Sequence, residues 1–179
     1  MPSAETASAW LDRFFDSYYR RRPVNATFIG VHQFDHLLPD FSEGGAGDTL
    51  AEMESLLATG KLALPSSPTE RLDLDLAAGF LETQLWEFRA THFHRGNPSL
   101  YTGEAVFGLM SLFLTDSTTA GERVEAAAAR MAGIPALLGQ GRRAIREAPL
   151  GWTERAIREC HAGEAFLALA RIQEKTGDV

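Results

Sequence analysis

Large apolar side chains recur at a spacing of four residues near the start of the chain. Two such series interleave: Trp10, Phe14 and Tyr18, and Leu11, Phe15 and Tyr19. On a helix this spacing places all six side chains on one face, which is typical of a helix packed on a core. The basic residues 20–22 suit the negative end of a helix dipole, and Pro23 cannot continue the helix. We therefore predict a helix over residues 3–22.

Glycine and proline divide the stretch that follows. Residues 23–30 predict a short helical turn, with Pro23 at its first position and Gly30 at its end. Residues 31–41 show no period and are predicted to be irregular. The glycines at 44, 45 and 47 predict a flexible link over residues 43–47, because no strand precedes them and no Gly-Lys-Ser/Thr follows, as a phosphate-binding loop requires. A helix capped by Asp48 and ended by Gly60 is expected next.

The rest of the chain predicts four more helices. Capping boxes at residues 67–70 and 119–122 begin a long apolar helix to about residue 94 and an alanine-rich helix to about residue 147. Between them lies an apolar helix over 102–114, and a last helix runs over 153–175. Gly133-Ile134-Pro135 should break or kink the alanine-rich helix. Since no alternating period of two is long enough for a strand, we predict an all-α, irregular multi-helix array with mostly antiparallel neighbouring helices.

Composition and charge narrow the classes of partner. The chain is 45% hydrophobic and 23% charged, which is ordinary for a globular domain. Its 17 basic and 24 acidic residues give a net charge of -7, so nucleic-acid binding is not expected. The sequence shows no secretion signal and no apolar run long enough for a membrane helix. With a single cysteine, Cys160, these features predict a cytoplasmic protein without a membrane partner.

The sequence carries no complete catalytic or metal-binding pattern. His32 and His36 have the spacing of the HExxH zinc helix, but Gln33 occupies the place of its general base. His92 and His94 would point to opposite faces of a helix, and a single pair such as His161 and Glu164 makes no metal site. Cys160 is expected to be a small buried apolar residue. We predict no catalytic residue, no metal ligand and no cofactor in this chain.

Several motifs resemble a known family. The string PVNATFIGVHQFDHLLPDFS, from residue 23 onward, is similar to the first part of proteins with the domain of unknown function 885, a large and mostly bacterial family. Asn97-Pro98, Glu122-Arg123, Ile134-Pro135 and the W-T-E-x-A-I segment at 152–157 are similar in order and spacing. The resemblance covers nearly the whole chain.

The resemblance implies a function that lies partly outside these residues. Family members are longer and resemble helical zinc peptidases, with the HExxH helix well beyond the matched region. The resemblance implies that residues 1–179 form a single N-terminal helical segment of a larger protein. This segment would have no activity by itself and would help to form the wall of a substrate channel. Zinc would belong to the full-length parent, and no zinc ligand can be carried over. The alternative is a self-contained helical module that binds a partner protein.

Two expectations concern contacts. His32, Asp35 and His36 either line or buttress the substrate channel, or satisfy backbone groups of their own loop. The expected partner is the downstream helical portion of the parent protein. Because the apolar helices show more than one apolar side, we also expect self-association of the isolated chain through an exposed patch. Its edge would include Trp86, Phe88, Phe107 and Phe113.

Overall fold

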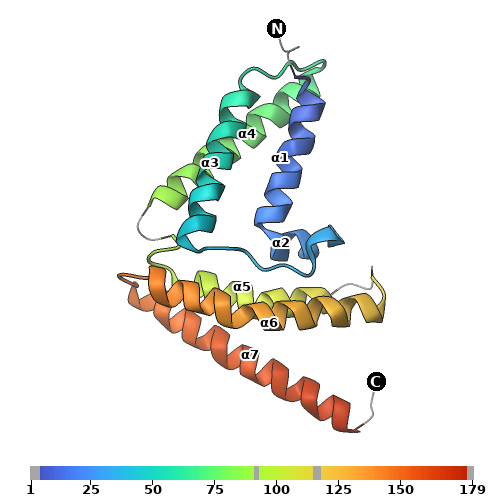
Figure 1. Cartoon of the computed structure of the whole chain (residues 1–179), viewed down its shortest axis with the longest axis vertical. Coiled ribbons are helices and arrows are strands. Elements are labelled where there is room, and N and C mark those ends of the chain that lie inside the picture. The colour runs from blue at the N-terminus through green and yellow to red at the C-terminus, as the bar shows by residue number, and fades with distance from the viewer. Residues whose placement is uncertain (1–4, 91–92, 115–117, 177–179) are drawn as a thin grey trace.

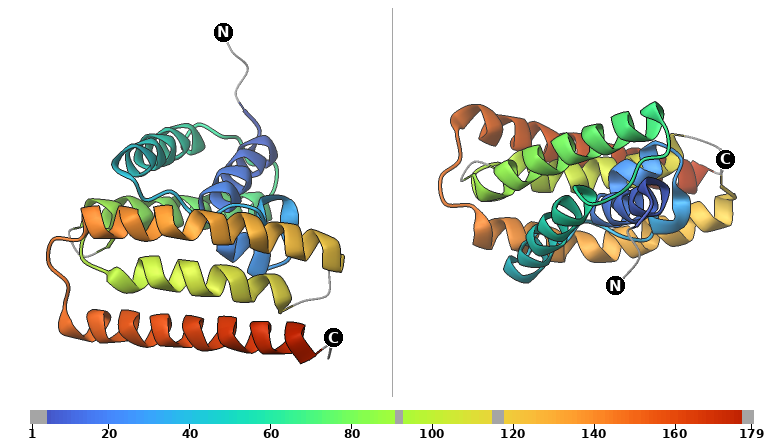
Figure 2. Two further views of the ribbon diagram at one scale, coloured as in Figure 1. Left: turned by 60° about the horizontal axis from the view of Figure 1, so that its bottom comes forward. Right: turned by 90° about the horizontal axis from the view of Figure 1, so that it is seen from above.

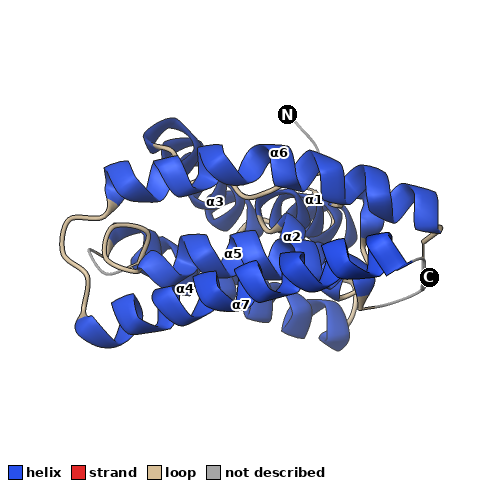
Figure 3. Ribbon diagram, turned by 90° about the horizontal axis from the view of Figure 1, so that it is seen from below, coloured by secondary structure: helices blue, strands red, loops and turns tan. Residues whose placement is uncertain are grey.

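The computed structural model describes residues 5–90, 93–114 and 118–176, with side chains up to residue 168. Over these residues the chain forms seven α-helices and two 3-10 turns and no strand, with one isolated bridge between Thr6 and Leu64. The prediction of an all-α fold is confirmed (Figure 3). The helices are α1 (Ala7–Arg21), α2 (Pro23–Phe28), α3 (Glu43–Gly60), α4 (Pro68–Arg89), α5 (Pro98–Met110), α6 (Ala120–Ala144) and α7 (Leu150–Thr176), and the 3-10 turns are η1 (His32–Phe34) and η2 (Ser111–Phe113).

The helices form two groups. In the first, α5 packs against both α6 and α7, and the three lie side by side as a layer (Figure 2). In the second, α1, α3 and α4 pack against one another and stand across that layer, while α2 lies at the junction (Figure 1). Successive long helices run antiparallel within each group, because short connections return the chain beside the helix it has just left.

The core of the second group is centred on Trp10. Its side chain is completely buried, and its indole N–H donates to the Leu56 carbonyl at 3.0 Å and the Thr59 hydroxyl at 3.1 Å. Gly60 lets the ring approach, because a Cβ there would lie 2.6 Å from it. Phe15, however, is 45% exposed. A stripe two residues wide is too broad for one contact, since adjacent side chains on a helix diverge by about 100°.

The flexible link expected over residues 43–47 is wrong. These residues form the first turn of α3, which begins six residues earlier than predicted, with the Ser42 hydroxyl accepting from the Gly45 N–H at 3.1 Å. Gly45 is buried, and a Cβ at this position would lie 2.5 Å from the Asp40 carboxyl. The glycine therefore permits a close approach between the start of α3 and the preceding segment, rather than providing flexibility.

Several predicted helix boundaries also shift. α4 ends at Arg89, so His94 lies in the following turn, and His92 lies outside the described residues. α6 continues through Pro135 without a break. One missing backbone donor is tolerated there because the flanking turns keep their own hydrogen bonds and the helix is packed on α5. α7 begins at Leu150 instead of Thr153.

The expected apolar patch is only partly present. Trp86, Phe107 and Phe113 are exposed, but Phe88 is buried in the core against Phe93, so it is not part of a surface. Phe28 pairs with Phe107 instead, at 5.5 Å between ring centroids, and both are exposed. In the described part of the chain, no helix is both long and apolar enough to cross a membrane.

The cap of α4 gives the first testable prediction. The Ser67 hydroxyl accepts from the Glu70 N–H at 3.1 Å, and Pro68 occupies the first helical position. Ser67→Ala leaves that N–H without its acceptor and should lower the free energy of unfolding by about 1 kcal/mol. Ser55→Ala, at an exposed position inside α3, is the control and should not destabilise. Urea unfolding that shows no difference between the two variants would contradict this role of the cap.

Candidate functional site

A buried arginine lies at the junction between the two groups of helices and binds α2, α5, η2 and the segment after η1. Arg130 of α6 is 0% exposed, and its guanidinium donates to acceptors on four other segments. Three of these acceptors are backbone carbonyls, and two are hydroxyls. The acceptors and distances are the Leu37 carbonyl at 2.9 Å, the Gly108 carbonyl at 2.5 Å, the Pro23 carbonyl at 3.3 Å, the Thr27 hydroxyl at 2.7 Å and the Ser111 hydroxyl at 3.3 Å. Burial lowers the pKa of Arg130 to about 10, against the opposing effect of Asp35 and Glu104.

Two of the predicted candidates belong to this network. The Thr27 hydroxyl donates to an Asp35 carboxylate oxygen at 2.6 Å, and the other oxygen lies 2.9 Å from His32 Nδ1. Asp35 thus supplies the negative charge nearest to Arg130 and ties η1 to α2. His36 is exposed and takes no part in these hydrogen bonds. None of the three lines the pocket described next.

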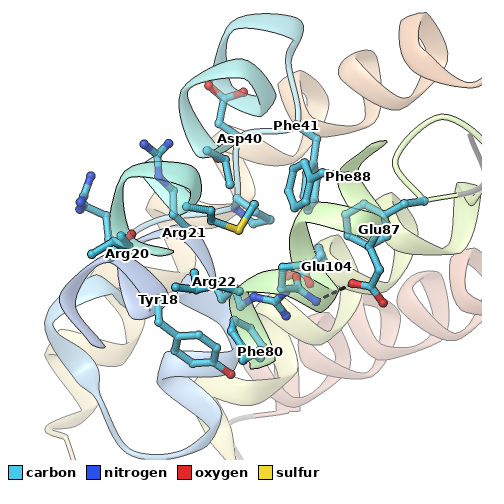
Figure 4. Close-up of a pocket in the computed structure, with 18 of the residues that line it drawn as sticks. Tyr18, Arg20, Arg21, Arg22, Asp40, Phe41, Phe80, Glu87, Phe88 and Glu104 are labelled. Atoms are coloured by element: carbon cyan, nitrogen blue, oxygen red, sulfur yellow. Dashed lines mark hydrogen bonds between the residues drawn. The ribbon is translucent and has the colours of Figure 1, made fainter. Parts of the chain in front are cut away.

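A pocket of about 490 Å³ lies between the two groups of helices. Its walls come from the end of α1, the segment 37–41, α3, α4 and the start of α5 (Figure 4). Most of the lining is aromatic or aliphatic: Phe14, Tyr18, Leu38, Phe41, Met53, Phe80, Leu81, Phe88, Phe93 and Leu100. This volume and this lining are typical of sites for small ligands, which have mostly apolar walls and a few convergent polar groups.

Arg22 is the cation of this pocket. Its guanidinium lies 5.1 Å from the centroid of the Phe80 ring and 5.6 Å from that of Tyr18. Among the described residues it has no hydrogen-bonding partner, and burial lowers its pKa although the negative charges of Glu87 and Glu104 oppose this. The two preceding arginines differ from Arg22 because they form ion pairs: Arg20 and Arg21 each lie 2.7 Å from the Glu52 carboxylate. Arg22 therefore keeps its donors available toward the pocket.

Two acceptors face the same space. Burial raises the pKa of Glu104 to about 7, although Arg22 and Arg130 oppose the shift, and no described residue donates a hydrogen bond to its carboxyl. Gln84 is 6% exposed, and its Nε2 donates to Glu87 at 2.5 Å. Its Oε1 has no hydrogen-bonding partner in the described part of the chain. Because a carboxylate accepts only from the amide N–H₂, the Glu87 contact fixes the orientation of the Gln84 side chain.

These three residues were not recognised in the sequence. Arg22 is explained there by the helix dipole, and Gln84 is one of several polar residues on a long apolar helix. A signal exists for Glu104, because it is the only charged residue between Pro98 and Leu114. A lone carboxyl within an apolar helix is a candidate for burial and an altered pKa.

The described residues do not fit a zinc site. No group of three His, Cys, Asp or Glu side chains among them could hold a metal ion. Cys160 is exposed rather than buried as expected, as are His161 and Glu164 beside it. Cys160 and Glu164 line an open groove that α7 forms with α5 and α6.

Replacing Arg130 tests whether its hydrogen bonds stabilise the arrangement of the helices. Arg130→Met removes the donor to three buried carbonyls and leaves Asp35 without its buried counter-charge. This should lower the free energy of unfolding by about 3–5 kcal/mol. Arg142→Met changes an exposed arginine of the same helix and should stay within about 0.5 kcal/mol of the parent. If chemical unfolding shows Arg130→Met to cost less than about 1 kcal/mol, the guanidinium does not stabilise this arrangement.

Comparisons with known proteins agree with the motifs in the sequence. A solved structure described as "a putative lipoprotein of unknown function from Shewanella oneidensis" matches with a TM-score of 0.77 and 23% identity, over 89% of this chain and 29% of its own. At this identity the likeness shows the fold, and the chain spans less than a third of that protein. No curated protein matches. A family model described as "Bacterial protein of unknown function (DUF885)" matches residues 23–174, and the chain therefore belongs to this family.

Proposed function

We propose that this chain is the noncatalytic helical part of a larger zinc-peptidase-like protein, and that its pocket forms a wall of the substrate channel. The observation that carries the proposal is the pocket itself. It has a volume of about 490 Å³ and is mostly apolar. Three polar groups face it without a hydrogen-bonding partner in the described chain: the guanidinium of Arg22 just after α1, Oε1 of Gln84 in α4 and the carboxyl of Glu104 in α5. Unpaired buried polar groups are unfavourable unless a ligand satisfies them, so such a site is typical of binding.

The proposal also identifies a partner for this chain, which is the remaining helical part of the longer protein. The chain spans 29% of the length of the solved structure that it resembles. In a protein of that length, further helices would cover the exposed apolar side chains Trp86, Phe107 and Phe113. The catalytic zinc that the family resemblance implies would be held by those helices, and the present pocket would hold part of the substrate. Without such a partner, the same side chains would promote self-association.

One observation favours the alternative of a self-contained interaction module. Phe28, Ile29 and Phe107 are all exposed, and the rings of Phe28 and Phe107 are in contact. Exposed aromatic pairs are common in protein-binding surfaces. In this alternative the surface binds another protein and the pocket needs no ligand. The cytoplasmic location stays a prediction in either case.

A pocket-filling variant tests the proposed function. Leu100 lines the pocket and is partly buried, so Leu100→Trp should fill part of the space. We expect the chain to bind one molecule of an aromatic sulfonate dye, with an affinity at least about tenfold lower in Leu100→Trp. Leu76→Trp, at an exposed position of α4, should bind as the parent does. Thermal melts confirm that each variant is folded. Equal dye affinity in Leu100→Trp and the parent would contradict a binding role for the pocket.

The noncatalytic role predicts a second result. The purified chain should hold no stoichiometric zinc and should hydrolyse no peptide, because the described residues contain no group of three metal-binding side chains. Metal analysis and a peptide-hydrolysis assay measure this. One tightly held zinc per chain, lost in His32→Ala, would show that the chain carries a metal site of its own.

A further inference from the structure

The unpaired N–H donors of Arg22 indicate one chemical group that a ligand of the pocket should carry. A guanidinium presents five N–H donors in a plane and matches the two oxygens of a carboxylate. Of the three consecutive arginines that line the pocket, Arg20 and Arg21 are already bound to Glu52. Arg22 instead lies over two aromatic rings, which hold the guanidinium in place without using its hydrogen bonds. A ligand oxygen anion is therefore the complement that Arg22 lacks.

The unpaired acceptors of the pocket indicate a second chemical group of the ligand. Gln84 Oε1 is buried and unpartnered in the described chain, and the carboxyl of Glu104 also receives no hydrogen bond from it. Glu87 adds negative charge beside them. These groups complement an N–H donor. An amine alone would be repelled by Arg22, and a phosphate alone would be repelled by Glu87 and would leave Gln84 unsatisfied.

We propose, resting on the proposed function, that the pocket binds a free carboxylate that is joined to an N–H donor and an apolar side chain. An N-acyl amino acid and the C-terminal residue of a peptide share this chemistry. The carboxylate binds Arg22, the N–H donates to Gln84 Oε1, and the apolar side chain lies among rings such as Phe41 and Phe88. A pocket of about 490 Å³ has room for one such residue and part of the next.

Glu104 gives this site a dependence on pH. The charges of Arg22, just after α1, and Arg130 of α6 act on it, and Glu87 of α4 lines the same pocket. Arg155 and Glu159 of α7 line a second pocket that Glu104 also borders. Below pH 7 Glu104 is mainly neutral and Arg22 is free to bind an anion. As Glu104 ionises above pH 7, its charge offsets that of Arg22 and repels the ligand carboxylate. Binding is therefore stronger at pH 6 than at pH 8.

Matched ligands test the assignment. Calorimetric titrations of the chain with N-acetylphenylalanine and its amide, at pH 6, compare a carboxylate with a neutral group of the same shape. We expect the acid to bind at least about tenfold more tightly. Arg22→Gln should remove this difference, whereas Arg20→Gln, a change to an arginine paired with Glu52, should keep it. Equal binding of acid and amide, or a preference that survives in Arg22→Gln, would overturn the proposal.

Two further comparisons test the acceptors. 3-Phenylpropionate lacks the N–H, so it should bind more weakly than N-acetylphenylalanine to the parent, and equally to Gln84→Leu. Glu104→Gln should remove the loss of affinity between pH 6 and pH 8. An unchanged preference in Gln84→Leu, or an unchanged pH dependence in Glu104→Gln, contradicts the proposed contacts.

The failures of the two proposals are distinguishable. If the dye enters the pocket but acid and amide bind equally, the assigned ligand class is wrong and the binding site stands. If neither amino-acid compound binds and Leu100→Trp does not affect the dye, the binding site is wrong as well.

Discussion

The arrangement of the helices depends on the hydrogen bonds of Arg130. Its guanidinium donates to the backbone carbonyls of Leu37, Gly108 and Pro23, which belong to three different segments of the chain. A buried cation is costly, and this one is compensated by Asp35, which in turn binds Thr27 and His32. Backbone packing reinforces the same point, since a Cβ at Gly108 would lie 3.1 Å from Leu38 and 3.2 Å from Val24. One side chain thereby fixes segments that are distant in sequence.

The hydrogen bonds of Arg130 and the core around Trp10 explain how the neighbouring pocket can hold polar groups without hydrogen-bonding partners. Arg130 holds the segment before α3 against α5 and α6, while the core around Trp10 holds α1 against α3 and α4. Between these rigid parts, Arg22 and Glu104 come close enough to influence each other without a hydrogen bond between them. Their charges are therefore preorganised by residues outside the pocket. A site of this kind can bind a ligand with little rearrangement of the protein.

Local signals in the sequence predicted the helices better than the site. The capping residues Ser67 and Thr119 mark real helix starts because a cap is a local contact. The glycines at 44, 45 and 47 led to the wrong prediction of a flexible link. Gly45 instead permits a close approach to Asp40, which is a tertiary contact that the sequence does not show. Arg130 lies in an alanine-rich helix whose sequence does not single out this arginine, and its burial depends on acceptors 19 to 107 residues away. Long-range contacts of this kind leave no period in the sequence.

The ionisation of Glu104 tests the central claim most directly, because it reports burial, the nearby guanidinium groups and the lack of a donor at once. Its side-chain carboxyl can be followed by carbon NMR across a pH titration, with Glu104→Gln assigning the signal. The structure predicts a pKa of about 7 for Glu104, raised by burial. A pKa close to 4.5, the ordinary value for glutamate, would mean that the carboxyl is solvated or paired. The pocket would then not be the preorganised, partly dehydrated site described here.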